Sequence, residues 1–160
     1  MQLLDLMRRL LLRWAERRMR RAPDRVIGVD YMRRWHAVPR NRFVNVYLHE
    51  FSGSDDDRAL HDHPWMSCSV ILRGWYLEHL PANAANPAGE TRAHFRDTGS
   101  VTVRRASAAH RIEISRAPVV TLFITGPHRR EWGFWCAKGW RHWRVFTDPK
   151  DRGQVGRGCE

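Results

Sequence analysis

The sequence predicts a single small all-β barrel preceded by one amphipathic α-helix. Its 160 residues suit one domain with a hydrophobic core of its own. Helical spacing of apolar residues is confined to the start of the chain, and from Phe43 onward short β-branched and aromatic segments alternate with Gly, Pro and Asn. The predicted units are the helix at 1–24, the barrel at 25–147 and a flexible tail at 148–160.

Residues 3–21 have the pattern of an amphipathic helix that ends before Pro23. Arginines fill one face, and the apolar positions that recur at helical spacing are Leu3, Leu4, Met7, Leu10, Leu11 and Trp14. We expect this apolar stripe to pack on the barrel or on a second copy of the chain, which makes a homodimer possible. A helix that lies on a membrane surface or binds another partner is the alternative interpretation.

The barrel segments are short and regularly spaced, as in antiparallel barrels and sandwiches. No second helix is predicted among them. The predicted strands cover residues 43–51, 59–63, 67–78, 91–96, 100–104, 109–115, 119–125, 131–136 and 142–146.

The net charge of +11 is concentrated at the N-terminus. Residues 1–42 hold twelve Arg against four acidic residues, a net of +8, which leaves +3 for residues 43–160. Charge alone usually marks a solvated face, and no base-stacking or recognition-helix pattern accompanies it. Contact of the N-terminal helix with nucleic acid or a membrane surface is therefore a minor interpretation that stays open.

The sequence contains no run of eighteen apolar residues, so no transmembrane segment is predicted. Arg8, Arg9 and Arg13 interrupt any signal-peptide core. The three cysteines at 68, 136 and 159 are odd in number and lack C-x-x-C spacing, so we expect reduced thiols and a cytoplasmic protein.

His61-Asp62-His63 is the most informative triplet. Residues two apart on a strand point to the same side, so both imidazoles can reach one metal ion. On a straight strand Ser67 and Arg73 share that side. The alternative for such a pair is two surface histidines, or histidines that only support other ligands.

The stretch around these histidines resembles the first motif of the cupin superfamily, in which H-x-H is followed by Glu and, six residues later, by Gly. Here His61 and His63 are followed by Ser67 in the glutamate position and by Gly74. The serine departs from the pattern, so the resemblance implies no carboxylate ligand.

The second cupin motif runs from a glycine through Pro-x-Gly to a histidine. This chain has Gly99 and His110 at those ends, with Arg105 and Ser107 in place of the Pro and Gly. The resemblance covers about residues 40–146. It implies a double-stranded β-helix, or jelly-roll, barrel that holds one metal ion with His61, His63 and His110.

Three neutral imidazoles leave the charge of a metal uncompensated and coordination positions open, which favours an anionic or water-derived ligand. Similar three-histidine cupins include thiol dioxygenases, in which iron(II) binds substrate and oxygen. The resemblance therefore implies one divalent ion, Fe(II) before Zn, Mn or Ni, in an oxygenase that acts on a small polar or carboxylate-bearing molecule. The alternatives are a non-catalytic cupin that binds metal or a small ligand, and a zinc-dependent hydrolase or isomerase.

Further side chains could surround the metal or contact the substrate. Tyr47 has packing as its alternative role, and the dense segment 125–134 has a salt-bridged turn as its alternative. The candidates are His49, Tyr47, Ser67, Arg73, Arg130 and Glu131.

Overall fold

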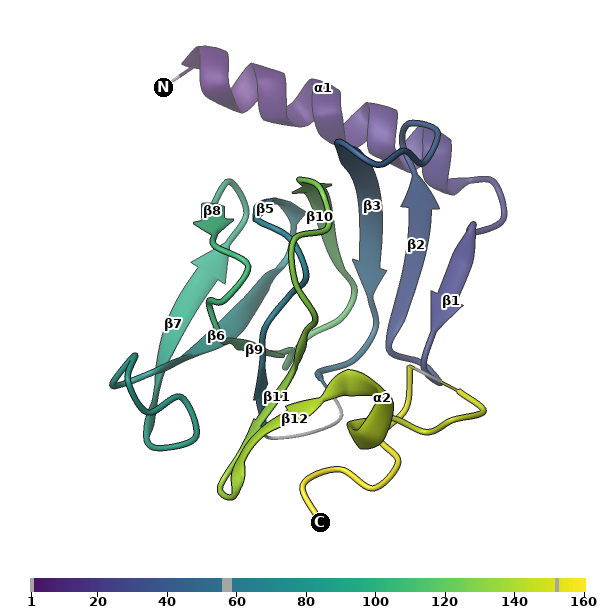
Figure 1. The fold of residues 1–160 in the computed structure, drawn as a ribbon. Coiled ribbons are helices and arrows are strands. Elements are labelled where there is room, and N and C mark those ends of the chain that lie inside the picture. The colour runs from purple at the N-terminus through teal and green to yellow at the C-terminus, as the bar shows by residue number, and fades with distance from the viewer. Residues whose placement is uncertain (1, 56–58, 152) are drawn as a thin grey trace.

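The computed structural model describes residues 2–55, 59–151 and 153–160, and in this part of the chain three antiparallel sheets form a barrel beneath an N-terminal helix (Figure 1). The largest sheet has six strands in the order β1-β2-β3-β10-β5-β8. They are β1 (Arg25–Ile27), β2 (Met32–His36), β3 (Asn45–Phe51), β10 (Val119–Thr125), β5 (Ser67–Arg73) and β8 (Val101–Arg104).

Two three-stranded sheets complete the barrel. The first has the order β12-β11-β4, and the second has the order β7-β6-β9. Their strands are β4 (Leu60–His61), β6 (Trp75–Pro81), β7 (Thr91–Asp97), β9 (Arg111–Glu113), β11 (Gly133–Cys136) and β12 (Gly139–His142). The predicted all-β barrel with one N-terminal helix is confirmed.

The boundary between two of these sheets falls at Gly74. The sequence predicts one strand over 67–78, whereas the chain turns at Gly74, which adopts φ +89°, so that β5 joins the large sheet and β6 joins β7 and β9. Gly99, with φ +96°, follows β7 at the turn into β8. Glycine adopts positive φ at little energetic cost, whereas a residue with a Cβ atom would be strained. Both turns therefore require glycine.

Helix α1 (Gln2–Met19) lies across one end of the barrel (Figure 1). Its fully buried residue is Ala15, which packs with Leu48, Leu72 and Val120 on the outer face of the large sheet, together with the partly buried Leu12. The small side chain of Ala15 lets the helix approach the sheet closely.

The predicted stripe therefore does not pack on the barrel, and its packing on a second copy stays a prediction. Leu3, Met7, Leu10, Leu11 and Trp14 are exposed, and the side chain of Leu4 lies outside the described residues. Periodicity shows that a helix has an apolar face, but the shape of the sheet selects which residues of the helix contact it. Among the described helices, none has the length and apolar character needed to cross a bilayer.

The C-terminal region also differs from the prediction. Residues 143–146, expected in a strand, form the short helix α2 (Trp143–Phe146). In place of a flexible tail, Val155 forms a β-bridge with Thr147, and a Cys136–Cys159 disulfide joins the tail to β11. The prediction of three reduced thiols, on which the cytoplasmic assignment rested, is wrong for this pair.

Candidate metal centre

The three histidines of the sequence prediction lie together at one side of the barrel interior. His61 is at the end of β4, His63 lies two residues later, and His110 directly precedes β9. The backbones of His61 and His110 exchange two N–H···O hydrogen bonds of 2.9 Å, and the His63 amide donates to Ala106 O over 3.0 Å. Backbone pairing therefore brings two segments almost fifty residues apart to one point.

The side-chain nitrogens of His61, His63 and His110 all lie within 4.8 Å of one another. The Nε2 atoms of His63 and His110 are 2.8 Å apart, so these two rings face each other directly. Two nitrogens bound to one ion at about 2.1 Å each are separated by roughly 3 to 3.5 Å. The cluster is thus close to the dimensions of a coordination site.

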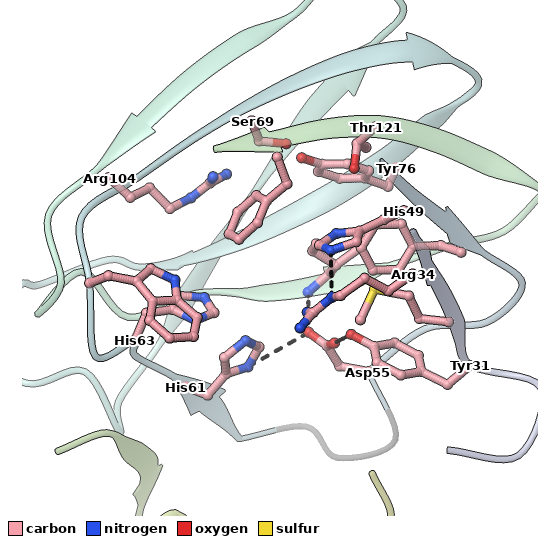
Figure 2. A pocket seen from close by; sticks show the side chains of 15 residues that line it. Tyr31, Arg34, His49, Asp55, His61, His63, Ser69, Tyr76, Arg104 and Thr121 are labelled. Carbon is pink, nitrogen blue, oxygen red and sulfur yellow. Dashed lines mark hydrogen bonds and ion pairs between the residues drawn. The ribbon is translucent and has the colours of Figure 1, made fainter. Parts of the chain in front are cut away.

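Carboxylates lie behind two of the three rings. Asp55 Oδ2 is 3.8 Å from His61 Nδ1 (Figure 2), and Glu78 Oε1 is 3.2 Å from His110 Nδ1. The latter contact is poorly aligned, so His110 Nδ1 has no hydrogen-bond partner among the described residues. Carboxylates at Nδ1 orient metal-binding histidines with the opposite ring nitrogen toward the ion.

Burial keeps the imidazoles of His63 and His110 in the neutral, metal-binding form. It is the largest cause that lowers the pKa of His63 well below its ordinary value, and the nearby His110 and His61 lower it further. Burial also lowers the pKa of His110 to about 4, although the neighbouring Glu78 carboxylate opposes the shift. The donor set therefore fits a divalent ion that accepts imidazole ligands, such as Fe(II), Mn(II) or Zn(II).

Two acidic residues that the sequence analysis missed are held firmly. Asp55 accepts hydrogen bonds from Tyr31 Oη at 2.5 Å and from the Ile112 amide at 2.6 Å. Glu78 is fully buried and accepts from Arg104 and, over 2.9 Å, from Arg96.

Burial alone would raise the pKa of Glu78, but the contacts with His110 and Arg104 outweigh it and lower the pKa to about 2. The sequence did hold a signal for Glu78. It lies two residues after Tyr76 on the same strand, so both side chains point to the same side, and an aromatic residue there indicates the barrel interior. No comparable signal was available for Asp55, which lies in a loop.

A cavity of about 350 Å³ opens beside the histidine cluster. Aromatic side chains form much of its lining, namely Trp65, Trp132, Phe134, Trp143 and Phe146. A smaller space of about 90 Å³ continues inward between Ser69, Tyr76, Arg104 and Thr121 (Figure 2). His61, His63 and Arg34 line both spaces, so a ligand in the cavity would lie beside the cluster.

Arg34 is the most informative residue that the sequence analysis missed. It extends from β2 into the cavity, where its Nε donates to His49 Nε2 over 2.9 Å (Figure 2). Its guanidinium also lies 4.8 Å from the centre of the Tyr47 ring. No carboxylate among the described residues pairs with it. Burial lowers the pKa of Arg34 to about 10, so the guanidinium remains charged at neutral pH.

His49 and Tyr47 are both buried and both support Arg34. The His49 ring lines the inner cavity and stacks on Tyr47, with ring centres 5.9 Å apart. Burial, followed by the charge of Arg34, lowers the pKa of His49 well below its ordinary value, so His49 accepts the Arg34 hydrogen bond as a neutral imidazole.

Ser67 and Arg73 do not reach the cavity. Ser67 is buried and its hydroxyl has no partner among the described residues, whereas Ser69 lines the inner space. Arg73 pairs with Glu16 of α1 over 3.0 Å, on the outside of the barrel. The register between β5 and β10 shifts between Ile71 and Arg73, and this irregularity breaks the parity on which the Arg73 prediction depended.

The segment 125–134 contributes structural contacts at the rim. Arg130 lies 2.8 Å from Asp62, whose buried carboxylate points away from the cluster and also accepts from the Gly133 amide. Glu131 pairs with His142 over 2.8 Å near the surface. These contacts match the salt-bridged turn more closely than a substrate-binding pair.

No family model and no curated protein matches the chain. Solved structures do resemble it. An uncharacterised conserved protein with a double-stranded β-helix domain from Klebsiella pneumoniae subsp. pneumoniae MGH 78578 aligns with a TM-score of 0.50 and 12% identity over 67% of this chain and 86% of that one. This chain has the double-stranded β-helix, or cupin, fold.

Two further structures support the cupin fold. A putative mannose-6-phosphate isomerase from Ralstonia eutropha JMP134 has a TM-score of 0.51 and 14% identity over 65% of this chain and 92% of that one. The S161A mutant of Bacillus subtilis oxalate decarboxylase has a TM-score of 0.52 and 17% identity over 74% of this chain. The alignment spans only 31% of the decarboxylase, an enzyme that contains Mn(II) centres. At these identities the likeness concerns the fold alone.

Proposed function

We propose that this cupin is a metal-dependent enzyme that binds a small carboxylate-bearing molecule at His61, His63 and His110, and that its reaction is an iron(II)-dependent oxygenation. The observation that carries the proposal is one cavity lined by His61 and His63 of the cluster and by Arg34, a partly buried guanidinium without a described acidic partner. A buried charge without a partner is costly, and an anionic ligand would compensate it.

The bound ion would supply Lewis acidity, one-electron chemistry in the case of iron, and open coordination positions. Arg34 would hold the carboxylate of the substrate through paired N–H donors, since a planar guanidinium matches a carboxylate. Its hydrogen bond to His49 and its packing on Tyr47 fix its orientation before the substrate arrives. Asp55 and Glu78 would hold the histidine rings in place, and the aromatic lining of the cavity would limit access of water.

The contacts of the two carboxylates favour oxygenation over hydrolysis or isomerisation. Isomerisation calls for a general base that accepts a proton from the substrate, and hydrolysis is faster with one that accepts a proton from metal-bound water. Among the described residues near the cluster, Asp55 is occupied by Tyr31 and Ile112, and Glu78 by Arg96 and Arg104. Oxalate decarboxylase contains Mn(II), and its name implies a dicarboxylate substrate. Both are compatible with this kind of site.

The metal is tested by elemental analysis of protein purified without chelator. We expect close to one divalent ion per chain in the wild type, loss of that ion in His63→Ala, and full retention in His94→Ala, which removes an exposed histidine of β7. A wild type without metal, or a His63→Ala variant that keeps it, would contradict the proposal.

The reaction is tested by oxygen uptake with a panel of small mono- and dicarboxylates, using protein loaded with Fe(II), Mn(II), Ni(II) or Zn(II). We expect uptake with Fe(II), and about 10- to 100-fold weaker substrate binding in Arg34→Gln with unchanged metal content. Arg33→Gln is the matched control, because Arg33 is the exposed neighbour that pairs with Glu50.

Three results would replace this reaction with an alternative. Turnover without oxygen consumption would indicate a lyase, hydrolase or isomerase. Tight metal binding without any turnover would indicate a non-catalytic binding cupin. Equal substrate binding by Arg34→Gln and the wild type would show that Arg34 does not bind the carboxylate of the substrate. It would not affect the proposal that the three histidines bind a metal.

A further inference from the structure

Helix α1 carries an unusual amount of exposed apolar surface. The side chains of Leu3, Leu10 and Trp14 are 69%, 55% and 41% exposed, and Leu6 and Met7 are also exposed. At 100° per residue these five positions fall within about 100° of the helix circumference, so they form one continuous strip. We refer to Leu3, Leu6, Met7, Leu10 and Trp14 as the exposed stripe.

The exposed stripe is distinct from the face that holds the helix on the barrel. The packing face consists of Ala15 with the partly buried Leu12 and Met19, which contact the apolar outer side of the large sheet. Folding of the barrel therefore does not require the exposed stripe. A contiguous apolar patch of this kind on a soluble domain marks an interaction surface.

Arginines border the stripe along one side of the helix. Arg9 and Arg13 lie along this border, Arg17 follows the C-terminal end of the stripe, and Arg20 and Arg21 follow the end of the helix. Arg9 pairs with Asp5, but among the described residues Arg13, Arg17, Arg20 and Arg21 form no ion pair. The surface thus combines an apolar strip with uncompensated positive charge.

We propose that α1 docks the protein onto an anionic membrane surface, with the exposed stripe in the interfacial layer and the arginine border on lipid headgroups. Interfacial helices have this combination of Leu, Met and Trp on one side and basic residues beside them. A second copy of the chain would bring two arginine borders together, and a nucleic acid would contact the arginines but leave the apolar strip exposed.

The position of α1 in the fold suits such docking. Figure 1 shows α1 at the opposite end of the molecule from β11 and α2, which contribute Phe134, Trp143 and Phe146 to the cavity lining. A helix lying on a membrane would therefore hold these elements of the cavity wall away from the bilayer. Docking and the proposed metal chemistry use separate residues, so either can fail without the other.

The test is flotation of the full-length protein with lipid vesicles. We expect binding to vesicles of phosphatidylcholine with roughly one third phosphatidylglycerol, weak binding to phosphatidylcholine alone, and loss of binding in high salt, because salt screens the arginines. Leu10→Asn should lower the partition coefficient about tenfold, since one leucine no longer enters the apolar layer. An Arg13→Gln/Arg17→Gln double variant should bind more weakly only to the anionic vesicles.

Val103→Asn is the matched control, because Val103 is 67% exposed on β8, outside the stripe. It should bind as the wild type does, and all variants should keep the wild-type melting temperature. Absence of binding, or equal binding by Leu10→Asn and the wild type, would overturn the proposal. Two other results would also overturn it. One is a dimer that depends on the stripe, without any binding to vesicles. The other is salt-dependent binding to RNA that Leu10→Asn does not change, again without binding to vesicles.

Discussion

The two faces of the six-stranded sheet are built from opposite kinds of side chain. On the outer face, Leu48 and Val120 are fully buried beneath α1. Their immediate neighbours along the chain, His49 and Thr121, are equally buried but face the interior of the barrel, where they line the cavity. The strand alternation thus places apolar residues outside and polar residues inside.

This arrangement separates stability from chemistry. A small barrel that served only its own stability would fill its interior with apolar side chains. Here the interior has such packing only in part, where Met32, Phe51 and Ile112 belong to a second apolar cluster. The remaining interior keeps buried polar groups beside the histidines, and the apolar cluster under α1 compensates for their cost.

The largest expected effect concerns the outer face. Leu48→Ala should lower the free energy of unfolding by about 2 to 5 kcal/mol, because it opens a void between the sheet and α1. Ser67→Ala, inside the barrel, should change it by less than about 1 kcal/mol, since the hydroxyl removed has no described partner. Urea unfolding followed by far-UV circular dichroism measures both. A larger loss from Ser67→Ala than from Leu48→Ala would reverse the comparison.

Much of the metal centre could be predicted from local spacing, whereas its surroundings could not. The His61–His63 pair follows from strand periodicity, and His110 follows from its distance to Gly99 in the cupin-like pattern. Arg34 escaped prediction because β2, Met-Arg-Arg-Trp-His, has adjacent arginines of which one is exposed and one enters the cavity. Only the pairing of β2 with β3, which sets Arg34 opposite His49, distinguishes them.

Long-range packing also explains the errors. Parity predicted the side of Arg73 on a straight strand, but the register shift between β5 and β10 cannot be inferred from one strand alone. Periodicity identified α1, but the buried face depends on the shape of the sheet that Ala15 meets. The Cys136–Cys159 disulfide joins residues whose proximity depends on how the tail folds back past α2.

The second prediction uses pH to distinguish the two faces. Burial holds the pKa of His49 below that of an unfolded histidine, about 6.5. Below pH 6.5 the histidine of the unfolded chain gains a proton that folded His49 does not. The contribution of His49 to the free energy of unfolding is therefore fully present above this pH and decreases as the pH falls. The advantage of the wild type over His49→Gln should therefore shrink by about 1.4 kcal/mol per pH unit below 6.5.

Urea unfolding in chelator at pH 7.5, 6.0 and 5.5 measures this difference. The other buried histidines are common to both proteins and cancel from it. Leu48→Ala provides the contrast, because its cost should be the same at each pH. An advantage of the wild type that does not change with pH would show that His49 is not held neutral in the folded state.

The smallest expected effect comes from two single substitutions on β10 that replace threonine by valine at one position and valine by threonine at the adjacent one. Thr121→Val keeps the shape of the side chain and removes a buried hydroxyl without a described partner, so it should raise the free energy of unfolding by about 1 kcal/mol. Val120→Thr places a hydroxyl in the apolar cluster beneath α1 and should lower it by about 1 to 3 kcal/mol. A loss of stability in Thr121→Val would mean that water or a ligand in the cavity satisfies the hydroxyl. The interior polarity would then stabilise the fold as well as line a binding site, and the separation between the two faces would be less complete than the packing suggests.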